Sequence, residues 1–234
     1  MYARSAAIYD ALFSSKDYAG EAEKIHALIQ QHKLSPGSVL LDVACGTGGH
    51  LPYLRAYYTI EGLDNEQAML ALARQRQPDL PFHQADMADF DLGRQFDALI
   101  CLFSSIGYVK TLERLRQTLK TFCRHTAPGG VVIVEPWFRP HQWQAGLFGT
   151  DVMRQPDFKA VRMWYSLREG NLSMMDEHYL VASSAGIEHF TERQELGLFA
   201  HEEYLAAFQE AGMAVTYDPA GLIGQGLYIG VADE

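Results

Sequence analysis

Residues 41–50 read LDVACGTGGH, and this stretch decides the fold. Residues Ser38–Val43 (SVLLDV) form a short apolar run after a Pro-Gly turn signal, which predicts a buried parallel strand. Gly46 and Gly48 predict a tight turn, and a short helical stretch through Leu54 follows it. A strand, a glycine turn and a helix in this order place backbone N–H groups at the carboxyl edge of a sheet, where open α/β sheets bind their ligands.

The same alternation of short apolar runs and amphipathic helices continues along the chain. Asp17, Asn65 and Thr111 are each expected to cap the start of a helix. The helix after Thr111 is expected to end at Pro128-Gly129-Gly130, and a further helix is expected over His201–Ala211. The other expected strands are Thr59–Leu63, Pro81–Gln84, Phe96–Leu102, Val131–Glu135, Ala214–Tyr217 and Gly226–Val231. The pattern predicts a Rossmann-like α/β fold with right-handed βαβ units and a seven-stranded, mostly parallel sheet.

Between Lys159 and Phe199 the pattern changes to three strand-like runs, AVRMWYSL, LSMMDEHYLVA and GIEHFTERQELGLF. Turn signals at 169–171 and 183–186 separate them. In the first run the residues alternate between two faces, with Arg162, Trp164 and Ser166 on one and Met163, Tyr165 and Leu167 on the other. We expect an antiparallel β-ribbon inserted at about residues 140–200 as a wall or lid, within a single domain that spans residues 1–234.

Composition narrows the class of partner. The 234 residues carry a net charge of −10 and no basic run, which argues against a nucleic-acid or anionic membrane surface. No apolar run approaches the roughly 20 residues that span a bilayer, and the first residues, MYARSAAIYDALF, lack the pattern of a signal peptide. The three cysteines form no disulfide framework. We expect a cytoplasmic protein without a nucleic-acid or membrane partner, and a homodimer stays open.

The glycine loop alone leaves three ligands open: a dinucleotide, a phosphate, or a molecule without phosphate. The dinucleotide fingerprint wants a glycine or alanine where this chain has Leu51, and the lysine of a phosphate-binding loop is absent. Asp64 ends the second strand and suits a ribose diol. Asp86 with Met87 suits an adenine amine and ring, and Asp42 is placed to organise the loop or to meet an ammonium. An aminoacyl ligand carries that ammonium, whereas a dinucleotide does not.

These features together resemble the Rossmann-like methyltransferases that depend on S-adenosylmethionine (AdoMet), with LDVACGTG, EGLD and QADM as their first three motifs. The segments KDYAGEA, CLFSSIGY, VVIVEPWF, SLREG, EHYLVA and GLFAHEEYLAAFQEAGM are similar to one family of that class. It is the sugar N,N-dimethyltransferases of nucleoside-diphosphate-linked aminodeoxysugars, such as those that become desosamine and mycaminose. The resemblance runs from about Tyr9 to Gly230 and implies an enzyme of antibiotic biosynthesis that methylates a small-molecule amine, with AdoMet as cofactor and S-adenosylhomocysteine (AdoHcy) as its product.

The resemblance also implies a site, residue by residue. The cofactor would contact Tyr18, Asp42, Ala44, Gly46, Gly48, Asp64, Asn65, Met69, Asp86, Met87 and Leu102. The acceptor would contact Tyr9, Ser104, Tyr108, Trp137 and Phe138. Tyr9, Tyr108 and His178 are the expected catalytic residues, which orient the amine or serve as a weak base. No metal is expected, because no histidine shows metal-ligand spacing.

Two positions depart from the family pattern and leave alternatives open. Tyr108 stands where some relatives carry a histidine, and Gln225 stands where some read Gly-Arg-Gly. The acceptor is then either a nucleotide-linked amino sugar or an unrelated small amine or hydroxyl compound. Nitrogen is favoured, because a neutral amine needs no strong base and no acidic or histidine side chain is evident as one. A non-catalytic AdoMet-binding module and a nicotinamide oxidoreductase are the remaining alternatives.

Overall fold

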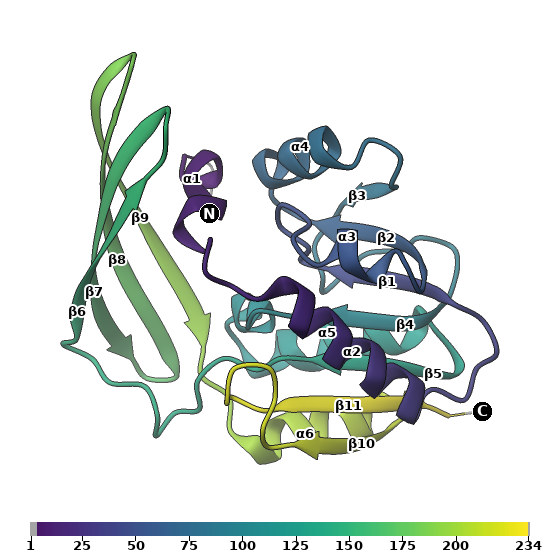
Figure 1. Cartoon of the computed structure of the whole chain (residues 1–234). Helices are drawn as coiled ribbons and strands as arrows, with labels where there is room; N and C mark the ends of the chain where they lie inside the picture. Colours follow the sequence, from purple (N-terminus) through teal and green to yellow (C-terminus); the bar gives the residue numbers. More distant parts are fainter. Residues whose placement is uncertain (1–3, 234) are drawn as a thin grey trace.

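The computed structural model describes residues 4–233 and contains a seven-stranded sheet and a four-stranded sheet (Figure 1). The strand order of the larger sheet is β10-β11-β5-β4-β1-β2-β3, and β11 alone runs antiparallel to its neighbours. The strands are β1 (Val39–Val43), β2 (Thr59–Asp64), β3 (Phe82–Gln84), β4 (Phe96–Cys101), β5 (Thr126–Val134), β10 (Met213–Asp218) and β11 (Leu227–Ala232). The predicted Rossmann-like, mostly parallel sheet is confirmed.

Helices cover both faces of this sheet. They are α1 (Ala6–Leu12), α2 (Tyr18–His32), α3 (Leu51–Leu54), α4 (Gln67–Arg76), the 3-10 helix η1 (Ser105–Val109), α5 (Leu112–Arg124) and α6 (His201–Glu210). Successive residues of β1 alternate between two apolar cores: Leu40 packs in the core that includes α2 and α3, and Leu41 in the core that includes α5 and α6. Within residues 4–233 no helix is long and apolar enough to cross a membrane.

Two of the three predicted helix caps are confirmed. Asp17 accepts a hydrogen bond from the Gly20 N–H (2.9 Å) at the start of α2, and Thr111 caps α5. The prediction for Asn65 is wrong: the N-cap of α4 is Glu66. The strand β2 runs one residue further than expected, and the Asp64 side chain accepts the Glu66 N–H at 2.8 Å. A side chain of the preceding strand, Asp64, therefore accepts the backbone N–H at the start of the helix.

The segment Pro128-Gly129-Gly130 does not close α5, as the sequence suggested. The helix ends at Arg124, and β5 already begins at Thr126. Gly129 has a φ of +69°, and its carbonyl accepts the backbone N–H groups of residues 34 and 35, at 2.7 and 3.0 Å. The Pro-Gly pair instead ties the start of β5 to the chain just after α2, at a position whose positive φ favours glycine.

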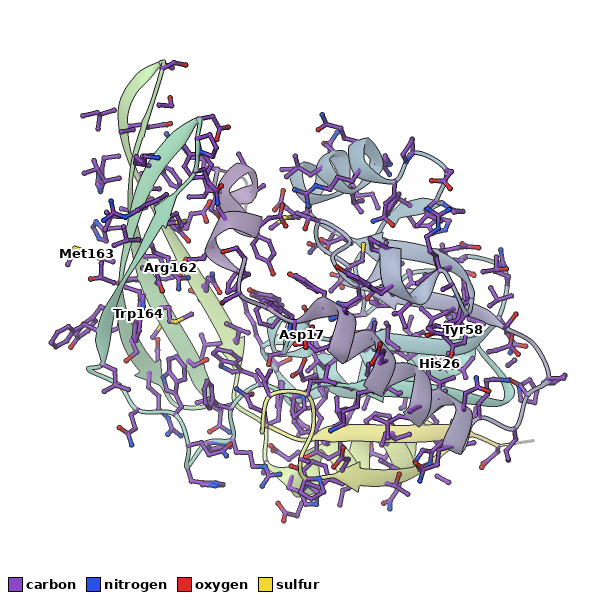
Figure 2. All side chains as sticks on the ribbon, viewed as in Figure 1. Asp17, His26, Tyr58, Arg162, Met163 and Trp164 are labelled. Carbon is purple, nitrogen blue, oxygen red and sulfur yellow. The ribbon has the colours of Figure 1, made fainter. Side chains whose placement is uncertain are left out.

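The smaller sheet is inserted between β5 and α6 and has the order β6-β7-β8-β9, antiparallel throughout. Its strands are β6 (Phe148–Arg154), β7 (Phe158–Glu169), β8 (Leu172–Ser183) and β9 (Gly186–Gly197). The predicted ribbon is confirmed with one more strand, β6, which the sequence pattern did not reveal. The predicted alternation in β7 also holds: the Met163 residue is 59% exposed, whereas the Arg162 side chain points toward α1 (Figure 2).

Helix α1 joins the two sheets and stands between the smaller sheet and α4 (Figure 1). Ile8 packs against Tyr179 and Phe190 of the smaller sheet. On its other side, Asp10 accepts a hydrogen bond from the Thr47 hydroxyl (2.7 Å) in the glycine loop and pairs with Arg76 of α4. One short helix therefore contacts both the inserted sheet and the loop that decides the fold.

The entry into β1 depends on one buried carboxylate, which gives a test of the fold. Asp97 of β4 accepts the backbone N–H groups of Gly37 (3.1 Å) and Val39 (3.0 Å). Asp97→Ala leaves both donors without this partner and should lower the free energy of unfolding by about 1–3 kcal/mol. Urea titration followed by circular dichroism measures it. Asp79→Ala, which removes an exposed ion pair with Arg55, is the control and should not move the midpoint. Equal midpoints for both variants would contradict the role given to Asp97.

Candidate functional site

A cavity of about 550 Å³ lies at the carboxyl ends of the parallel strands. A smaller one of about 40 Å³ shares several lining residues with it, among them Ala44, Gly46 and Phe103. The loop after β1 and the loop after β4 therefore contribute to both. Helix α1 supplies Tyr9 to both cavities, and the smaller sheet lines only the larger one.

The glycine loop presents bare backbone to the cavities. Gly46 has a φ of +56°, and a Cβ built there meets no atom within 4 Å, so any side chain would project into the ligand space. Ala44 also has a positive φ, of 58°, and lines both cavities. Gly48 lines neither: its carbonyl accepts a hydrogen bond from Gln77 (3.1 Å), and a Cβ there would lie 2.9 Å from that amide nitrogen. Gly48 therefore packs against Gln77, which directly follows α4, and Gly46 faces the cavities.

Asp64 lies at the end of β2 and is 8% exposed. Its Oδ2 accepts the Gly46 N–H and its Oδ1 the Glu66 N–H, both at 2.8 Å. Burial raises the pKa of this carboxyl, and the two backbone donors act against the rise. Each carboxylate oxygen has a second lone-pair direction, so Asp64 organises the loop and keeps the capacity to accept further hydrogen bonds.

Asp42, at the fourth position of β1, lines the smaller cavity and is 3% exposed. Within residues 4–233, no group donates a hydrogen bond to its carboxylate. Burial, and then the nearby charge of Asp64, raise its pKa to about 8. A buried carboxylate without a cation is costly, so this cavity suits a ligand that brings a positive charge. Tyr18 and Leu102 line the same cavity, and burial raises the Tyr18 pKa to about 12, which keeps its hydroxyl protonated.

The larger cavity is lined by the third acidic residue, Asp86, and by Met87, Asn65 and Met69. The Asp86 carboxylate accepts the Ala88 N–H at 2.8 Å and pairs with Arg114 at 2.7 Å. The sequence analysis missed Arg114. A cation in the first turn of a helix is unfavourable toward the helix dipole, and that oddity is the signal that points to a partner for this residue.

Aromatic rings line the part of the larger cavity that α1 and the loop after β4 form. Phe13 and Phe103 meet edge to face with centroids 4.9 Å apart, and Tyr9 packs on Phe13 at 4.8 Å. Tyr108 and Trp137 complete this wall. Neither Phe13 nor Phe103 was predicted, although Phe103 lies inside the quoted CLFSSIGY segment.

The loop that carries this wall is held in an uncommon conformation. Phe103 and Ser104 have φ values of 52° and 60°, in the left-handed region that non-glycine residues rarely adopt. Glu135, which follows β5, accepts the Phe103 N–H at 2.6 Å. The Ser104 hydroxyl donates to the Pro136 carbonyl at 2.8 Å, so this predicted acceptor residue lines the cavity with its hydroxyl proton already committed. Burial raises the pKa of Glu135 to about 7.

Four residues of the smaller sheet also line the larger cavity: Arg162, Met175, Gln194 and Leu196. The strand alternation had placed Arg162 on one face but had not indicated that this face is the inner one. Gln194 lies within hydrogen-bond distance of Tyr108, 3.2 Å from its hydroxyl. The smaller sheet therefore supplies polar groups to the aromatic part of the cavity.

Besides Gly48, two predicted residues lie outside both cavities. His178 is on the outer face of β8, exposed, with its ring stacked on His189 at 5.5 Å. Its neighbours Glu177 and Tyr179 face inward because side chains alternate along a strand, so the catalytic assignment of His178 is corrected. Phe138 packs against Trp137 at 4.7 Å from behind and does not line the cavity, whereas Trp137 does.

Comparison with known proteins agrees with this geometry. Residues 40–130 match the model of a methyltransferase domain. The chain is 43% identical, over 228 residues and 96% of each chain, to the dTDP-3-amino-3,4,6-trideoxy-alpha-D-glucopyranose N,N-dimethyltransferase of Streptomyces venezuelae. It is 41% identical over 230 residues to the dTDP-3-amino-3,6-dideoxy-alpha-D-glucopyranose N,N-dimethyltransferase of Streptomyces fradiae, covering 97% of this chain and 90% of the relative.

Solved structures are also similar to the structure of this chain. The crystal structure of Streptomyces venezuelae DesVI superposes with a TM-score of 0.91 at 42% identity, over 97% of this chain and 98% of that one. SAM-bound CalS10, an amino pentose methyltransferase from Micromonospora echinaspora involved in calicheamicin biosynthesis, superposes with a TM-score of 0.84 at 37% identity, over 96% and 94%. The chain belongs to the family of AdoMet-dependent sugar N,N-dimethyltransferases of nucleotide-linked aminodeoxysugars.

Proposed function

We propose that this enzyme transfers methyl groups from AdoMet to the amino group of a dTDP-linked aminodeoxysugar. One observation carries the proposal: Asp42, Asp64 and Asp86 lie at or just beyond the carboxyl ends of three neighbouring strands and line adjoining cavities beside an aromatic wall. Three carboxylates in a row match the three hydrogen-bonding parts of AdoMet: the ammonium, the ribose diol and the adenine amine.

Each part of AdoMet has a site whose chemistry fits it. Asp42 would hold the ammonium, since among residues 4–233 the smaller cavity places no lysine or arginine beside it. Asp64 would accept from the ribose diol with its remaining lone pairs. Met87 would cover the adenine, and Asp86 would accept from its amine. The open backbone at Gly46 leaves room for the methionyl chain between these ends.

When bound, AdoMet supplies a methyl group on a positively charged sulfur. The lone pair of the neutral acceptor amine forms the new C–N bond as the C–S bond breaks and its electron pair goes to sulfur, and the resulting ammonium then loses a proton. The protein has to align the two partners and exclude water, and such positioning can contribute roughly 7–11 kcal/mol. Tyr9 and Tyr108, which line the aromatic part of the larger cavity, are the residues that we assign to orienting the amine.

The nucleotide end of the acceptor needs positive charge, and the cations of the larger cavity already have partners. Lys110 pairs with Glu195, Arg114 with Asp86 and Arg162 with Glu177. The pairs of Lys110 and Arg114 are partly exposed, and exposed ion pairs are worth at most about 1 kcal/mol. Gln225 offers the diphosphate no positive charge. We therefore infer that the diphosphate replaces the carboxylate partner of Lys110 or of Arg114.

The acceptor is tested directly. Purified enzyme is incubated with AdoMet and each of the dTDP-linked amino sugars that the relatives' names specify, and products are followed by mass spectrometry. We expect the gain of one and then two methyl groups on at least one of these sugars. Methylation of a free amine without any turnover of the nucleotide-linked sugars would contradict the proposed acceptor, and no AdoMet-dependent methylation of any of them would contradict the proposed function.

The raised pKa of Asp42 predicts that cofactor binding releases a proton. Below about pH 8 the free carboxyl is protonated, and an ammonium beside it favours the carboxylate, so binding expels the proton and affinity rises with pH up to that value. Titration calorimetry with AdoHcy at pH 6.5, in two buffers of different ionisation enthalpy, should show release of up to about one proton. Asp42→Asn should abolish this release and weaken binding. Equal proton release by both proteins would contradict the assignment of the ammonium to Asp42.

The neutral residue in the Gly224-Gln225-Gly226 segment predicts a specific gain. Gln225→Arg adds a cation to the lining of the larger cavity, so the KM for a dTDP-linked sugar should fall, by about fivefold or more if the added charge contributes about 1 kcal/mol. Gln225→Met is the matched control, similar in length and without charge. The KM for the same amino sugar without its nucleotide should not fall in either variant. An equal fall for both sugars would argue against a diphosphate near this residue.

The cellular location and the oligomeric state are also part of this proposal. A biosynthetic methyltransferase that uses AdoMet and whose three cysteines are free fits the cytoplasm. The homodimer left open by the sequence stays a prediction. Light scattering on the purified protein decides the second.

A further inference from the structure

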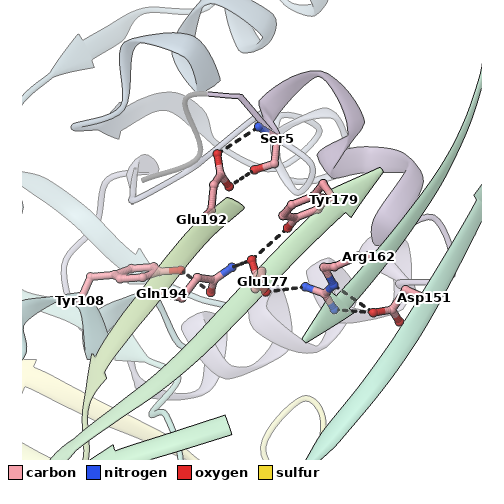
Figure 3. Close-up of polar contacts among 8 residues, drawn as sticks. All are labelled: Ser5, Tyr108, Asp151, Arg162, Glu177, Tyr179, Glu192 and Gln194. Atoms are coloured by element: carbon pink, nitrogen blue, oxygen red, sulfur yellow. Dashed lines mark hydrogen bonds and ion pairs between the residues drawn. The ribbon is translucent and has the colours of Figure 1, made fainter. Parts of the chain in front are cut away.

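A buried chain of hydrogen bonds leads from the larger cavity into the smaller sheet (Figure 3). Tyr108 donates its hydroxyl proton to Gln194 Oε1 at 3.2 Å, and Gln194 Nε2 donates to Glu177 Oε2 at 3.1 Å. Glu177 also receives the Tyr179 hydroxyl (2.9 Å) and Arg162 Nη1 (2.9 Å). Glu177 is 0% exposed and lines neither of the two cavities, and the methyl-transfer step does not use it directly.

The direction of every bond in this chain follows from Glu177. An ionised carboxylate only accepts hydrogen bonds. Burial raises the pKa of Glu177, and the charge of Arg162 together with the hydrogen bonds from Tyr179 and Gln194 acts against that rise and favours the ionised form. The amide nitrogen of Gln194 must therefore face Glu177, which turns the amide oxygen toward Tyr108. An amide oxygen only accepts, so the Tyr108 proton must point to Gln194. With its proton committed, the Tyr108 oxygen can meet a further group in the cavity only as an acceptor.

We propose that Glu177, acting through Gln194, is a positioning residue that fixes Tyr108 as a hydrogen-bond acceptor toward the substrate amine. The inference rests on the proposed function, because it needs an amine in the aromatic part of the larger cavity. A neutral amine that donates one N–H to Tyr108 has its lone pair directed away from that oxygen, and the lone pair is what attacks the methyl carbon. If the Tyr108 proton pointed into the cavity instead, it would bind the lone pair and block the attack.

The same polarity accounts for two rounds of methylation at one site. The primary amine and the monomethylamine both carry an N–H, so both can donate to Tyr108. The neutral dimethylamine carries none and loses this contact. A fixed acceptor at Tyr108 therefore holds both substrates of the sequence and does not hold the neutral final product.

The test is a double-mutant cycle on Glu177 and Tyr108 in the full-length enzyme. Glu177→Gln nearly preserves the shape of the side chain and lets the new amide donate to Gln194 Oε1. The Gln194 amide nitrogen then faces Tyr108 and donates to its oxygen, so the Tyr108 proton points into the cavity. We expect kcat for the primary amine to fall by about tenfold or more, as for other misplaced buried polar groups, with little change in KM. In a Tyr108→Phe background, which has no hydroxyl to orient, Glu177→Gln should change kcat by less than about twofold.

A control variant and a second test variant distinguish the proposed effect from a failure to fold. Asp176→Asn removes a charge and an exposed ion pair with Arg193 at the neighbouring position on the outer face of β8, and should leave kcat unchanged. Gln194→Met removes the amide that transmits the orientation while leaving Glu177 with Arg162 and Tyr179. It should lower kcat in the wild-type background and not in the Tyr108→Phe background. AdoHcy binding and the melting temperature identify any variant that fails to fold.

The outcomes separate this inference from the proposed function. Equal fold losses in both backgrounds would mean that Glu177 acts only on structure, and that result would overturn the inference while leaving the function intact. A wild-type kcat in Glu177→Gln, or a loss confined to KM, would overturn it in the same way. Failure of the unmodified enzyme to methylate any nucleotide-linked amino sugar would overturn both.

Discussion

The rest of the site depends on Asp42, a carboxylate that is buried in the middle of the sheet and has no cation beside it among residues 4–233. Asp42 lies on β1, between β4 and β2, and is only 3% exposed. An isolated buried carboxylate is costly when ionised, so the protein keeps it protonated up to about pH 8 until a positive group arrives. This constraint disfavours a phosphate or a dinucleotide at this position, because neither brings the positive charge that would offset the cost of an ionised Asp42. The neighbouring Asp64 then satisfies the loop backbone and keeps lone pairs for a diol.

The two halves of the site come from different sheets, and α1 joins them. Asp10 holds the helix to the glycine loop, while the Ser5 hydroxyl donates to Glu192 of β9 at 2.5 Å. Tyr9 lies between these two attachments and lines both cavities. A ligand that orders the glycine loop is thereby connected, through one short helix, to the sheet that carries Gln194 and Glu177. The site is continuous although its parts are distant in the sequence.

Much of the larger sheet could be predicted, because its strands are short apolar runs between turn signals and its first motif fixes where the ligand lies. The acidic residues at strand ends were found for the same reason. The misses have physical causes. Strand β6 is an exposed edge strand that contains Gly149 and Asp151, so neither apolarity nor propensity marks it. His178 was placed in the site because the alternation of a strand gives two faces without saying which is inner.

The remaining misses arise from contacts between distant segments, which periodicity does not encode. Arg114 reaches Asp86 across 28 residues, and Phe13 reaches Phe103 from a helix that the sequence analysis did not predict. The resemblance to a family found Tyr9 and Tyr108 but gave no reason for the polarity of the Tyr108 hydroxyl. That polarity depends on Gln194, 86 residues away, and became visible only with the side chains in place.

A crystal structure with AdoHcy and dTDP bound tests the central claim most directly. The account predicts the AdoHcy ammonium within hydrogen-bond distance of Asp42, its ribose hydroxyls on Asp64, and its sulfur facing the part of the larger cavity that Tyr9 and Tyr108 line. An amino-acid end bound away from Asp42, or a sulfur that faces away from the two tyrosines, would contradict it.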